Sequence, residues 1–510
     1  MSAQEEKRIR SEFGDFQTPK VLAERVCALL ADRGIHPASV LEPTCGSGAF
    51  LDAAVRAFPS ARRLLGLDIN PRYVADATTF LRESHPAADV QVRRTDFFRT
   101  DWAEVLTKLP KPLLVLGNPP WVTSAELGSL GSSNLPEKTN FQRQRGIDAL
   151  MGKSNFDISE WMLLRGLEWI EGQEASLAML CKVAVARKVL RYAWKHGQRL
   201  QRAEVHRIDA SKHFGASVDA CLFIVTGSPQ GGEAECAVYN SLEATAPLSR
   251  FGFRNGELVA DLHLYDKWKH LAGIGPQYYQ WRSGVKHDCS KVMELRRCGD
   301  STYLNGFQQK VGLERQFVFP MLKGSELANG AVAKPTRWML VTQSAIGADT
   351  CHIESEAPCT WRYLCAHAHW LDGRSSTIYQ KRPRFSVFGV GAYTFQPWRV
   401  AIAGLYKKFN FQVVGSFEDK PIVLDDTCYS VPCGSQAEAV CVHSLLHSEP
   451  AQEFLNAFVF WDSKRPVTVS LLGRLDLLAV AQEVGAKDEL PVRQRLLSGM
   501  DGPQQGSRSS

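Results

Sequence analysis

The N-terminal part of the chain repeats one pattern, a short apolar run followed by a polar or glycine-rich segment. The apolar runs have the length and composition of strands that are buried on both faces. Such strands, alternating with helices, predict an open and mainly parallel sheet of the doubly wound α/β class. In that class ligands bind beyond the carboxyl ends of the strands, so each segment after a strand is a candidate functional site. The strands are predicted at residues 39–41, 64–67, 90–92 and 112–115.

The segment after the first strand, Glu42-Pro43-Thr44-Cys45-Gly46-Ser47-Gly48, is a glycine loop that leads into a helix. Its glycines allow a tight turn and close approach of a ligand to the backbone. The loop lacks the third glycine of the dinucleotide fingerprint and the lysine of a phosphate-binding P-loop. Glu42 would repel a phosphate and attract a cation. The loop therefore predicts a nucleoside ligand that carries a positively charged tail.

Acidic residues follow the next two strands. Asp68 comes roughly 20 residues after the glycine loop, the spacing at which doubly wound sheets place an acid on ribose hydroxyls. Asp96 follows the third strand, where it can accept a hydrogen bond from an adenine amino group while Phe97 covers the ring. Upstream of the first strand, Thr18 is the predicted N-cap, and Pro19 the first residue, of a helix that continues over residues 21–30.

The fourth predicted strand ends in Asn118-Pro119-Pro120-Trp121. The two prolines fix φ and remove two N–H donors, so this segment can neither continue the sheet nor begin a regular helix. The stiff loop presents an amide side chain, a backbone carbonyl and a flat aromatic ring. These groups suit a planar ring with an exocyclic amino group, because the Asn118 side chain and the Pro119 carbonyl can accept its two hydrogens while Trp121 stacks on it.

Taken in order, these segments resemble the motifs of the γ-class of S-adenosylmethionine-dependent DNA adenine-N6 methyltransferases, the TaqI type. The resemblance covers residues 13–227 and rests on Phe16-Gln17-Thr18-Pro19, residues 41–48, Asp68, Asp96-Phe97 and Asn118 to Trp121. Residues 152–155, a helix over 160–170 and a strand over 176–180 are similar to the next motifs of the family. The chain departs from the family pattern at Trp121, where Tyr or Phe is commoner, and in the residues of its glycine loop, Thr-Cys-Gly-Ser-Gly.

The resemblance implies a Rossmann-like class I methyltransferase domain with a mixed, mainly parallel sheet, and S-adenosylmethionine as cofactor. It implies that Asn118 and the Pro119 carbonyl hold the target amino group, and that Trp121 and Phe214 stack on a flipped adenine. The implied site residues are, for catalysis, Asn118, Pro119, Pro120, Trp121 and Phe214, and, for the cofactor, Phe16, Thr18, Pro19, Glu42, Pro43, Gly46, Gly48, Asp68, Ile69, Asp96, Phe97 and Asn118.

A chain of 510 residues is too long for one ordinary core. We expect a catalytic domain over residues 1–245, a DNA target-recognition domain of α+β type over 246–495 and a disordered tail over 496–510. A Gly/Pro-rich stretch at 227–233 marks the predicted exit from the first domain. In the C-terminal half, basic residues are interleaved with aromatic ones, a pattern that suits contacts to double-stranded DNA. The predicted DNA-binding residues are Lys286, Lys381, Arg382, Arg384, Trp398 and Arg399. In the same half, residues 361–371 predict a helix, and the alternating residues 385–391 predict strands.

The amino-acid composition bears on the partner, the cellular compartment and the metal content that we expect. The net charge of +6 permits a polyanionic partner without demanding one, and 13 cysteines without a framework pattern fit reduced thiols in the cytoplasm. No apolar run reaches the length of a membrane span, and the N-terminus lacks a signal-peptide pattern. The cysteines and histidines between residues 351 and 369 do not follow a structural-zinc spacing, so no metal is expected.

Several alternatives stay open at this stage. Cytosine-N4 methylation uses closely related chemistry. A fused restriction–methylation enzyme would need a nuclease domain, for which Glu418-Asp419-Lys420 is too slight a signal. A cytosine-C5 enzyme is disfavoured, because Pro358-Cys359 and Pro432-Cys433 lie far down the chain. RNA or protein methylation and a catalytically dead DNA-binding protein are the remaining candidates. A separate cognate endonuclease is a possible partner, and a monomer is expected.

Overall fold

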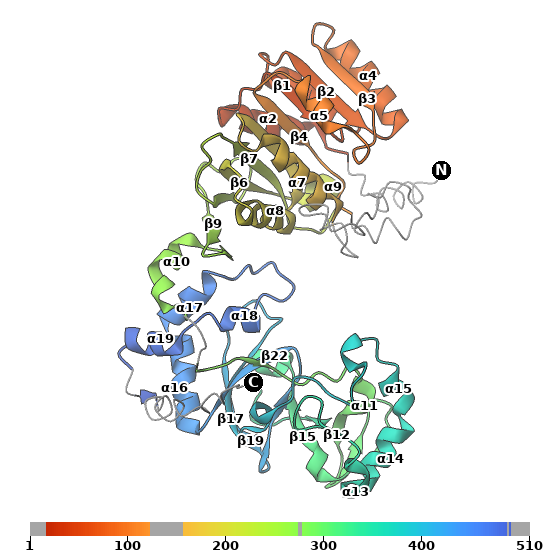
Figure 1. The fold of residues 1–510 in the computed structure, drawn as a ribbon, viewed down its shortest axis with the longest axis vertical. Helices are drawn as coiled ribbons and strands as arrows, with labels where there is room; N and C mark the ends of the chain where they lie inside the picture. Colours follow the sequence, from red (N-terminus) through yellow and green to blue (C-terminus); the bar gives the residue numbers. More distant parts are fainter. Residues whose placement is uncertain (1–16, 123–156, 274–277, 487–488, 491–510) are drawn as a thin grey trace, which may run out of the picture. The chain divides into compact units, whose positions relative to one another are not determined.

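The computed structural model describes residues 17–122, 157–273, 278–486 and 489–490, and the chain divides into two compact units between Leu262 and His263 (Figure 1). Phe16 and the motif predicted at residues 152–155 lie outside the described residues.

The first unit is built on a ten-stranded sheet with strand order β10-β9-β8-β6-β7-β5-β4-β1-β2-β3. Strands β3, β2, β1, β4 and β5 are parallel to one another, whereas β7 runs antiparallel to both β5 and β6. The elements are α2 (Lys20–Asp32), β1 (Ser39–Glu42), α3 (Ala49–Ala57), β2 (Arg63–Asp68), α4 (Pro71–Ser84), β3 (Val90–Arg94), α5 (Trp102–Thr107), β4 (Leu113–Gly117), α7 (Ile158–Ile170), β5 (Ala175–Lys182), α8 (Val183–Lys195), β6 (Leu200–Ile208), α9 (Ala210–Phe214), β7 (Ala220–Gly227), β8 (Glu235–Tyr239), β9 (Ser249–Arg254) and β10 (Glu257–Val259).

The central strands are apolar because helices cover both of their faces. Every residue of β1 and β4 is buried. Leu114 and Leu116 of β4 belong to a core cluster that also contains side chains of α2 and α3. Alternate residues face the other way, and Leu177 of β5 packs against Gly166 of α7. The predicted fold class, a mixed and mainly parallel α/β sheet of the Rossmann-like methyltransferase type, is confirmed.

The end of the first unit differs from the prediction. Residues 227–233 do not lead out of the unit, because β8, β9 and β10 return to the same sheet and extend it to Val259. The observed division after Leu262 is therefore later than the predicted boundary at residue 245. Gly227 marks a close approach of two segments, since a Cβ there would lie 1.9 Å from the Ile170 carbonyl oxygen.

The predicted start of α2 is wrong by one position. Its N-cap is Pro19, with extended φ and ψ of −60° and 136°, and no side chain caps the helix. Thr18 lies one residue before the cap, and the extended ψ of Pro19 delays the helix until Lys20. Thr18 is thus available for a role other than capping.

The described residues of the second unit form three smaller sheets, with strand orders β11-β22-β17-β18, β14-β13-β12-β16-β15-β21 and β19-β20. Its elements, with α10 at the boundary of the units, are α10 (Leu262–Trp268), η2 (Lys269–Leu271), β11 (Arg282–Ser283), α11 (Ser290–Met293), β12 (Glu294–Arg297), β13 (Thr302–Leu304), β14 (Lys310–Gly312), η3 (Arg315–Phe317), β15 (Val318–Leu322), α12 (Gly324–Ala328), β16 (Arg337–Leu340), α13 (Ile353–Glu356), α14 (Pro358–Ala366), α15 (Ala368–Asp372), η4 (Thr377–Tyr379), η5 (Ala392–Phe395), β17 (Trp398–Ala403), β18 (Gln412–Val414), β19 (Ser416–Phe417), β20 (Lys420–Pro421), β21 (Val423–Leu424), β22 (Cys428–Cys433), α16 (Gln436–His447), α17 (Glu449–Asn456), α18 (Val469–Leu472) and α19 (Leu477–Glu483).

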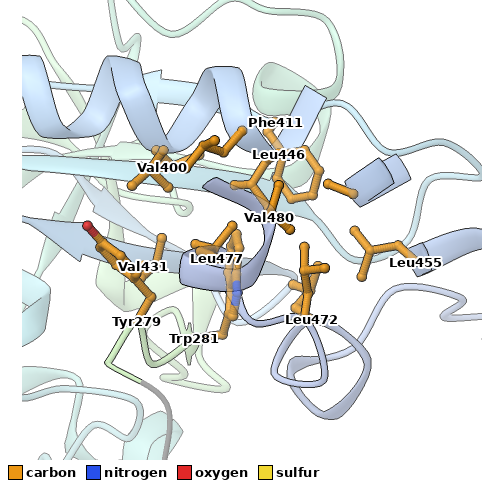
Figure 2. Close-up of a cluster of buried hydrophobic side chains, with 14 of the residues drawn as sticks. Tyr279, Trp281, Val400, Phe411, Val431, Leu446, Leu455, Leu472, Leu477 and Val480 are labelled. Atoms are coloured by element: carbon orange, nitrogen blue, oxygen red, sulfur yellow. The ribbon is translucent and has the colours of Figure 1, made fainter. Parts of the chain in front are cut away.

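Two large hydrophobic clusters hold the second unit together. One joins β17 and β22 to the C-terminal helices, and Figure 2 shows Val400 and Val431 of these strands beside Leu446, Leu477 and Val480. The other joins β12, β15 and β16 to α14 and α15. The second unit thus has cores of its own and is of mixed α+β type.

Two local predictions in the second unit were wrong. Residues 385–391 do not form strands, because Phe385 and Val387 are buried one by one in an irregular segment that makes a single bridge, from Phe388 to Lys286. The helix predicted over 361–371 is two helices, α14 and α15, that meet at His367.

Within the described residues, no helix combines the length and the apolarity needed to cross a membrane.

Candidate active site

The polar residues predicted for function gather at the carboxyl ends of the parallel strands. Glu42 ends β1, Asp68 ends β2 and Gly117 ends β4, directly before Asn118. The chain order reverses between β1 and its neighbour β4, since β2 and β3 lie on one side of this pair and β5 on the other. Open α/β sheets bind ligands at such a reversal. Glu42 and Asn118 therefore flank the place where this fold forms a binding crevice.

The glycine loop after β1 is held by side chains from two directions. The Gly46 N–H donates to Asp68 Oδ2 at 2.8 Å, and the Ser47 N–H donates to Gln17 Oε1 at 3.0 Å. Gly46 and Gly48 have positive φ values of 49° and 83°. A Cβ on Gly46 would lie 2.4 Å from Gln17 Oε1, so this glycine is required both by its conformation and by the close contact.

Glu42 is a buried acid with an unsatisfied oxygen. Its side chain is 2% exposed, and its Oε2 atom has no hydrogen-bond partner. Burial raises the pKa of the Glu42 carboxyl well above its ordinary value, and the charge of Asp68 adds to this rise in pKa. The Thr44 hydroxyl, two residues further on, is also buried without a partner. Buried polar groups of this kind are costly unless a ligand satisfies them.

The segment predicted to hold an adenine follows β3. The Asp96 side chain is 24% exposed; it accepts a hydrogen bond from the Phe98 N–H at 2.9 Å and lies 3.6 Å from Arg99 Nε. Phe97 is only 7% exposed, because its ring packs in a cluster with Phe98, Trp102, Trp161 and Trp169. Ile69, after β2, is 39% exposed and available to an adjacent ring.

The Asn118-to-Trp121 loop is tied to β5 and to α7. Asn118 is half buried and Pro119 is buried. The Trp121 indole N–H donates to the Leu180 carbonyl at 3.2 Å. The Ile158 N–H, at the start of α7, donates to the Val122 carbonyl at 3.0 Å.

Sequence reasoning missed a third tie to this loop. Lys182 Nζ, at the end of β5, donates to the Trp121 carbonyl at 3.1 Å and to Asp157 Oδ2 at 2.8 Å. Asp157 is 8% exposed and caps α7 by accepting from the Ser159 N–H. A lysine directly after an apolar strand, at the predicted ligand-binding edge, was the signal that could have revealed it.

The structure brings Trp121 and Phe214 together, although nearly a hundred residues separate them. Their rings are edge-to-face, with centroids 5.2 Å apart and planes at 72°. A base stacked between two rings needs about 7 Å, twice the contact distance of about 3.5 Å. In this arrangement the two rings contact each other and cannot sandwich a base. Phe214 is the more accessible of the two, since it is half buried whereas Trp121 is 6% exposed.

Comparison with known proteins gives the family. The type II methyltransferase M.NspV from Nostoc sp. is 41% identical over 481 residues, which cover 94% of this chain and 99% of that protein. The chain belongs to the type II methyltransferases. A second relative, the type II methyltransferase M.CvrRI from Paramecium bursaria Chlorella virus XZ-6E, is 32% identical over 117 residues, which cover 23% of this chain and 27% of that protein.

Two solved structures match the chain at low identity and with TM-scores below 0.5. The type IIL restriction–modification enzyme MmeI, in complex with DNA, is 14% identical, with a TM-score of 0.49 and coverage of 99% of this chain and 76% of that one. The M protein of the type I restriction enzyme EcoKI is 15% identical, with a TM-score of 0.31 and coverage of 44% of this chain and 48% of that one. No protein-family model matches the chain.

As a DNA methyltransferase of a restriction–modification system, the protein is expected to use S-adenosylmethionine, which its family implies. The crevice fits such a cofactor, because the unsatisfied Glu42 oxygen is a ready partner for an ammonium group and the Thr44 hydroxyl for a second polar group. The Gly46 and Gly48 backbone follows directly in the same loop.

Not all of the predicted DNA-binding residues of the methyltransferase are exposed and unpaired at its surface. Arg399 is 3% exposed and donates to the Thr394 and Gln396 carbonyls at 2.7 Å, so its prediction as a DNA contact is wrong. It lies within β17, where an interior arginine satisfies carbonyls of the preceding turn. Trp398 is half buried, and its ring covers Gly415. Lys286 is paired with Asp288 at 2.6 Å and Asp426 at 3.5 Å.

The other predicted contacts are exposed, although one is paired. Arg384 pairs with Asp372 at 2.7 Å. Lys381 and Arg382 are exposed, and Arg382 lies over the Phe388 ring at 5.6 Å. The described part of the chain brings no group of three or more His, Cys, Asp or Glu side chains into position for a metal ion.

Proposed function

We propose that the protein is a γ-class methyltransferase that transfers a methyl group from S-adenosylmethionine to the N6 amino group of a flipped-out adenine in double-stranded DNA. The observation that carries the proposal is the position of Asn118 and Pro119. This pair leaves the end of β4 beside Glu42, whose Cγ lies 3.6 Å from where a Gly117 Cβ would be. An acceptor pair for an amino group thus lies at the same edge of the sheet as a buried carboxyl group that can take the charge of a cationic cofactor.

The acceptor pair explains how a weak nucleophile becomes reactive. The lone pair of an adenine amino group is delocalised into the ring. The Asn118 side-chain oxygen and the Pro119 carbonyl, placed out of the ring plane, accept the two amino hydrogens and draw the nitrogen toward tetrahedral geometry. Positioning and electrostatic preorganisation then supply most of the rate enhancement. The bound cofactor supplies the electrophilic methyl group.

We assign the cofactor-holding roles residue by residue. Glu42 and Thr44 take the amino-acid end, with Thr18, Pro19, Pro43 and the Gly46 and Gly48 backbone around it. Asp68 takes the ribose hydroxyls while it also holds the glycine loop. Ile69, Asp96 and the edge of Phe97 surround the adenine; Phe97 acts from within its aromatic cluster, because little of its ring is exposed.

The target adenine must leave the duplex, at a cost of a few kcal/mol. Stacking on an aromatic ring offsets this by roughly 1–3 kcal/mol. Because Trp121 and Phe214 are in contact, we place the base against Phe214, the more accessible ring, with Trp121 and Pro120 forming the wall behind it.

We propose that the first unit is the catalytic domain and the second the target-recognition domain. We propose further that the protein acts as a monomer in the cytoplasm, with any cognate endonuclease separate from it. Cytosine-N4 methylation is the second candidate, because the same acceptor pair can hold the amino group of cytosine.

The two candidates differ in the base that they modify. Long-read sequencing that detects modified bases, applied to DNA from cells that express the chain, identifies both the base and its sequence context. The proposal expects N6-methyladenine at one position of a short recurrent sequence. N4-methylcytosine at such a position would favour the second candidate.

A further inference from the structure

The second unit contains a polar groove of about 460 Å³ that none of the predicted DNA-binding residues lines. Its walls come from α11, from β12, from the turn after β13 and from the start of β16. The charged side chains on these walls are Lys291, Arg296, Arg337 and Glu294.

The four charged side chains in the groove differ in whether they form an ion pair with another residue. Glu294 is paired with Lys323 at 2.6 Å, and Arg337 with Glu326 at 3.2 Å. Among the described residues, neither Lys291 nor Arg296 has a carboxylate within ion-pair distance. The groove therefore presents two exposed cations whose charge is not compensated. This contrasts with Lys286 and Arg384, which are paired.

An exposed aromatic ring adjoins the first of these cations. Lys291 Nζ lies 5.5 Å from the centroid of the Phe307 ring and 5.6 Å from that of Trp370. Trp370 is 45% exposed, which is high for a tryptophan. A cation beside a flat exposed ring is a combination that binds the phosphates and sugars of nucleic acid.

One part of the groove lining, residues 304–308, is a turn with a fixed shape. The Asn305 side chain is 3% exposed, and its Oδ1 accepts from the N–H groups of Phe307 and Gln309 at 2.9 and 3.0 Å. Gln308, at the tip, has a φ of 62°, a conformation that a non-glycine residue adopts only when its surroundings impose it. The turn therefore fixes the backbone at Gln308, whose exposed side chain lines the groove.

Gln308 also lies next to the second cation. Arg296 Nη2 donates to Gln308 Oε1 at 3.4 Å. An arginine and a glutamine are the side chains that pair in a bidentate manner with guanine and adenine in the major groove. Here both emerge from rigid backbone, Arg296 from β12 and Gln308 from the Asn305 turn.

We propose that this groove is a DNA-recognition site, in which Arg296 and Gln308 contact base edges and Lys291 with Trp370 contacts the adjacent sugar–phosphate backbone. The proposal rests on the proposed function only in taking duplex DNA as the substrate bound by the second unit. It is independent of which base receives the methyl group.

The backbone part of the proposal is tested by the salt dependence of binding. Full-length wild-type and variant proteins are titrated with a fluorescent duplex of mixed sequence at several salt concentrations. Lys291→Ala is expected to weaken binding several-fold and to lower the slope of log K against log salt by about 1. The control is Lys464→Ala, an exposed lysine in the segment after Trp461, which packs on the other core cluster. The control is expected to match the wild type.

The base-reading part is tested by the set of sequences that become methylated. A randomised duplex library is treated with each protein and read by modification-sensitive sequencing. Gln308→Ala and Arg296→Gln are expected to relax discrimination at one position each, on the order of 10-fold, whichever base is modified. Thermal melting and cofactor binding of each variant confirm that both units are folded. Both side chains are exposed, so either variant serves if the other fails to fold.

The outcomes separate the groove from the proposed function. Wild-type affinity and salt slope in Lys291→Ala, together with an unchanged set of methylated sequences in Gln308→Ala and Arg296→Gln, would overturn the groove assignment. Modification of cytosine in place of adenine, with discrimination still lost in these variants, would reject the proposed base and keep the groove.

Discussion

At the end of β4, a single side chain carries most of the proposed chemistry. We predict that Asn118→Ala lowers the methylation rate on the order of 10²–10³-fold, because one of the two acceptors for the amino group is lost. The dissociation constant for S-adenosylmethionine should change little, since Glu42, Asp68 and Asp96 still hold the cofactor. Single-turnover methylation and equilibrium cofactor binding measure the two quantities separately. Wild-type methylation by this variant would contradict the proposed role.

Glu42 links cofactor binding to stability. Because its pKa in the folded protein is raised above the ordinary value of 4.5, the folded state keeps a proton that the unfolded state has lost above that pH. The ligand-free protein therefore loses stability as the pH rises from about 4.5 through the raised pKa.

We predict opposite effects of Glu42→Gln on stability and on cofactor binding. At neutral pH the ligand-free variant should melt a few degrees higher, since each kcal/mol shifts Tm by about 2–4 °C in a domain of this size. This gain should shrink as the pH is lowered toward the ordinary carboxyl range. Cofactor affinity should fall roughly 10–100-fold, because the ammonium loses a charged partner. A lower Tm at neutral pH, or unchanged cofactor affinity, would count against the assignment.

For single residues, the sequence predicted where a functional residue lies in the fold better than it predicted whether the side chain is buried or paired. Glu42, Asp68 and Asn118 were found because each follows an apolar strand, and the chain alone locates strand ends. Arg399 was assigned to DNA because it is basic and lies among aromatic residues, and Lys286 because it lies in a polar stretch, residues 281–288. Whether an arginine faces solvent or satisfies carbonyls inside the unit depends on contacts far apart in the chain, which composition does not contain.

At the scale of elements, β5 and α7 act together as a brace for the loop after β4. Lys182 joins the Trp121 carbonyl to the cap of α7, and the Trp121 indole binds the Leu180 carbonyl. The loop that carries Asn118 is thus fixed at its far end by side-chain hydrogen bonds.

We predict that Lys182→Met lowers kcat about 10–100-fold, because displacement of the loop by a fraction of an ångström misplaces the acceptor pair. The KM for the cofactor should stay within about threefold, since Lys182 takes no part in the cofactor-holding set, and Lys182→Arg should restore part of the rate because it can still reach Asp157 and the carbonyl. Steady-state kinetics well below Tm measure the split between kcat and KM.

The matched control is Lys188→Met. Lys188 of α8 forms an ion pair with Glu160 of α7 at 3.1 Å, so it joins α8 to the same helix without touching the loop. Its loss should leave kcat near the wild-type value, because an exposed ion pair contributes about 0–1 kcal/mol to stability. Equal losses of kcat in the two variants would reduce Lys182 to a general structural role.

Helices and strands could be predicted where the pattern of neighbouring residues determines the secondary structure. Strands β1 to β5 and helices α2 and α7 lie close to their predicted positions, because apolar runs and helical periodicity depend on neighbouring residues only. The segment at 385–391 was mistaken for strands because its apolar residues alternate in the sequence. In the structure Phe385, Ser386 and Val387 are all buried, and the backbone is irregular. The short strands of the second unit carry too few residues for a clear period.

At the scale of the whole molecule, the chain consists of two units with separate cores. The division was expected from length, whereas its position after Leu262 was not. The Gly/Pro-rich stretch at 227–233 has the composition of a linker but connects two strands of one sheet. Only pairing between distant segments, such as β6 with β8, shows that the first unit continues.

We predict that residues 1–262, expressed alone, bind S-adenosylmethionine with an affinity within about threefold of the full chain, because every residue of the proposed cofactor site lies in this unit. Its affinity for duplex DNA should fall by at least about 10-fold, since the groove around Lys291 is missing and phosphate contacts dominate DNA affinity. Calorimetry for the cofactor and anisotropy for DNA measure both. DNA affinity equal to that of the full chain would argue against recognition by the second unit.

We expect the acceptor pair at Asn118 and Pro119 to direct methyl transfer to the N6 amino group of adenine. The most direct measurement incubates unmethylated duplex DNA with the protein and S-adenosylmethionine labelled in its methyl group, digests the DNA to nucleosides and analyses them by mass spectrometry. We expect the label in N6-methyldeoxyadenosine, and at least about 100-fold less of it from Asn118→Ala in the same initial-rate incubation. Label in N4-methyldeoxycytidine or in 5-methyldeoxycytidine would contradict it.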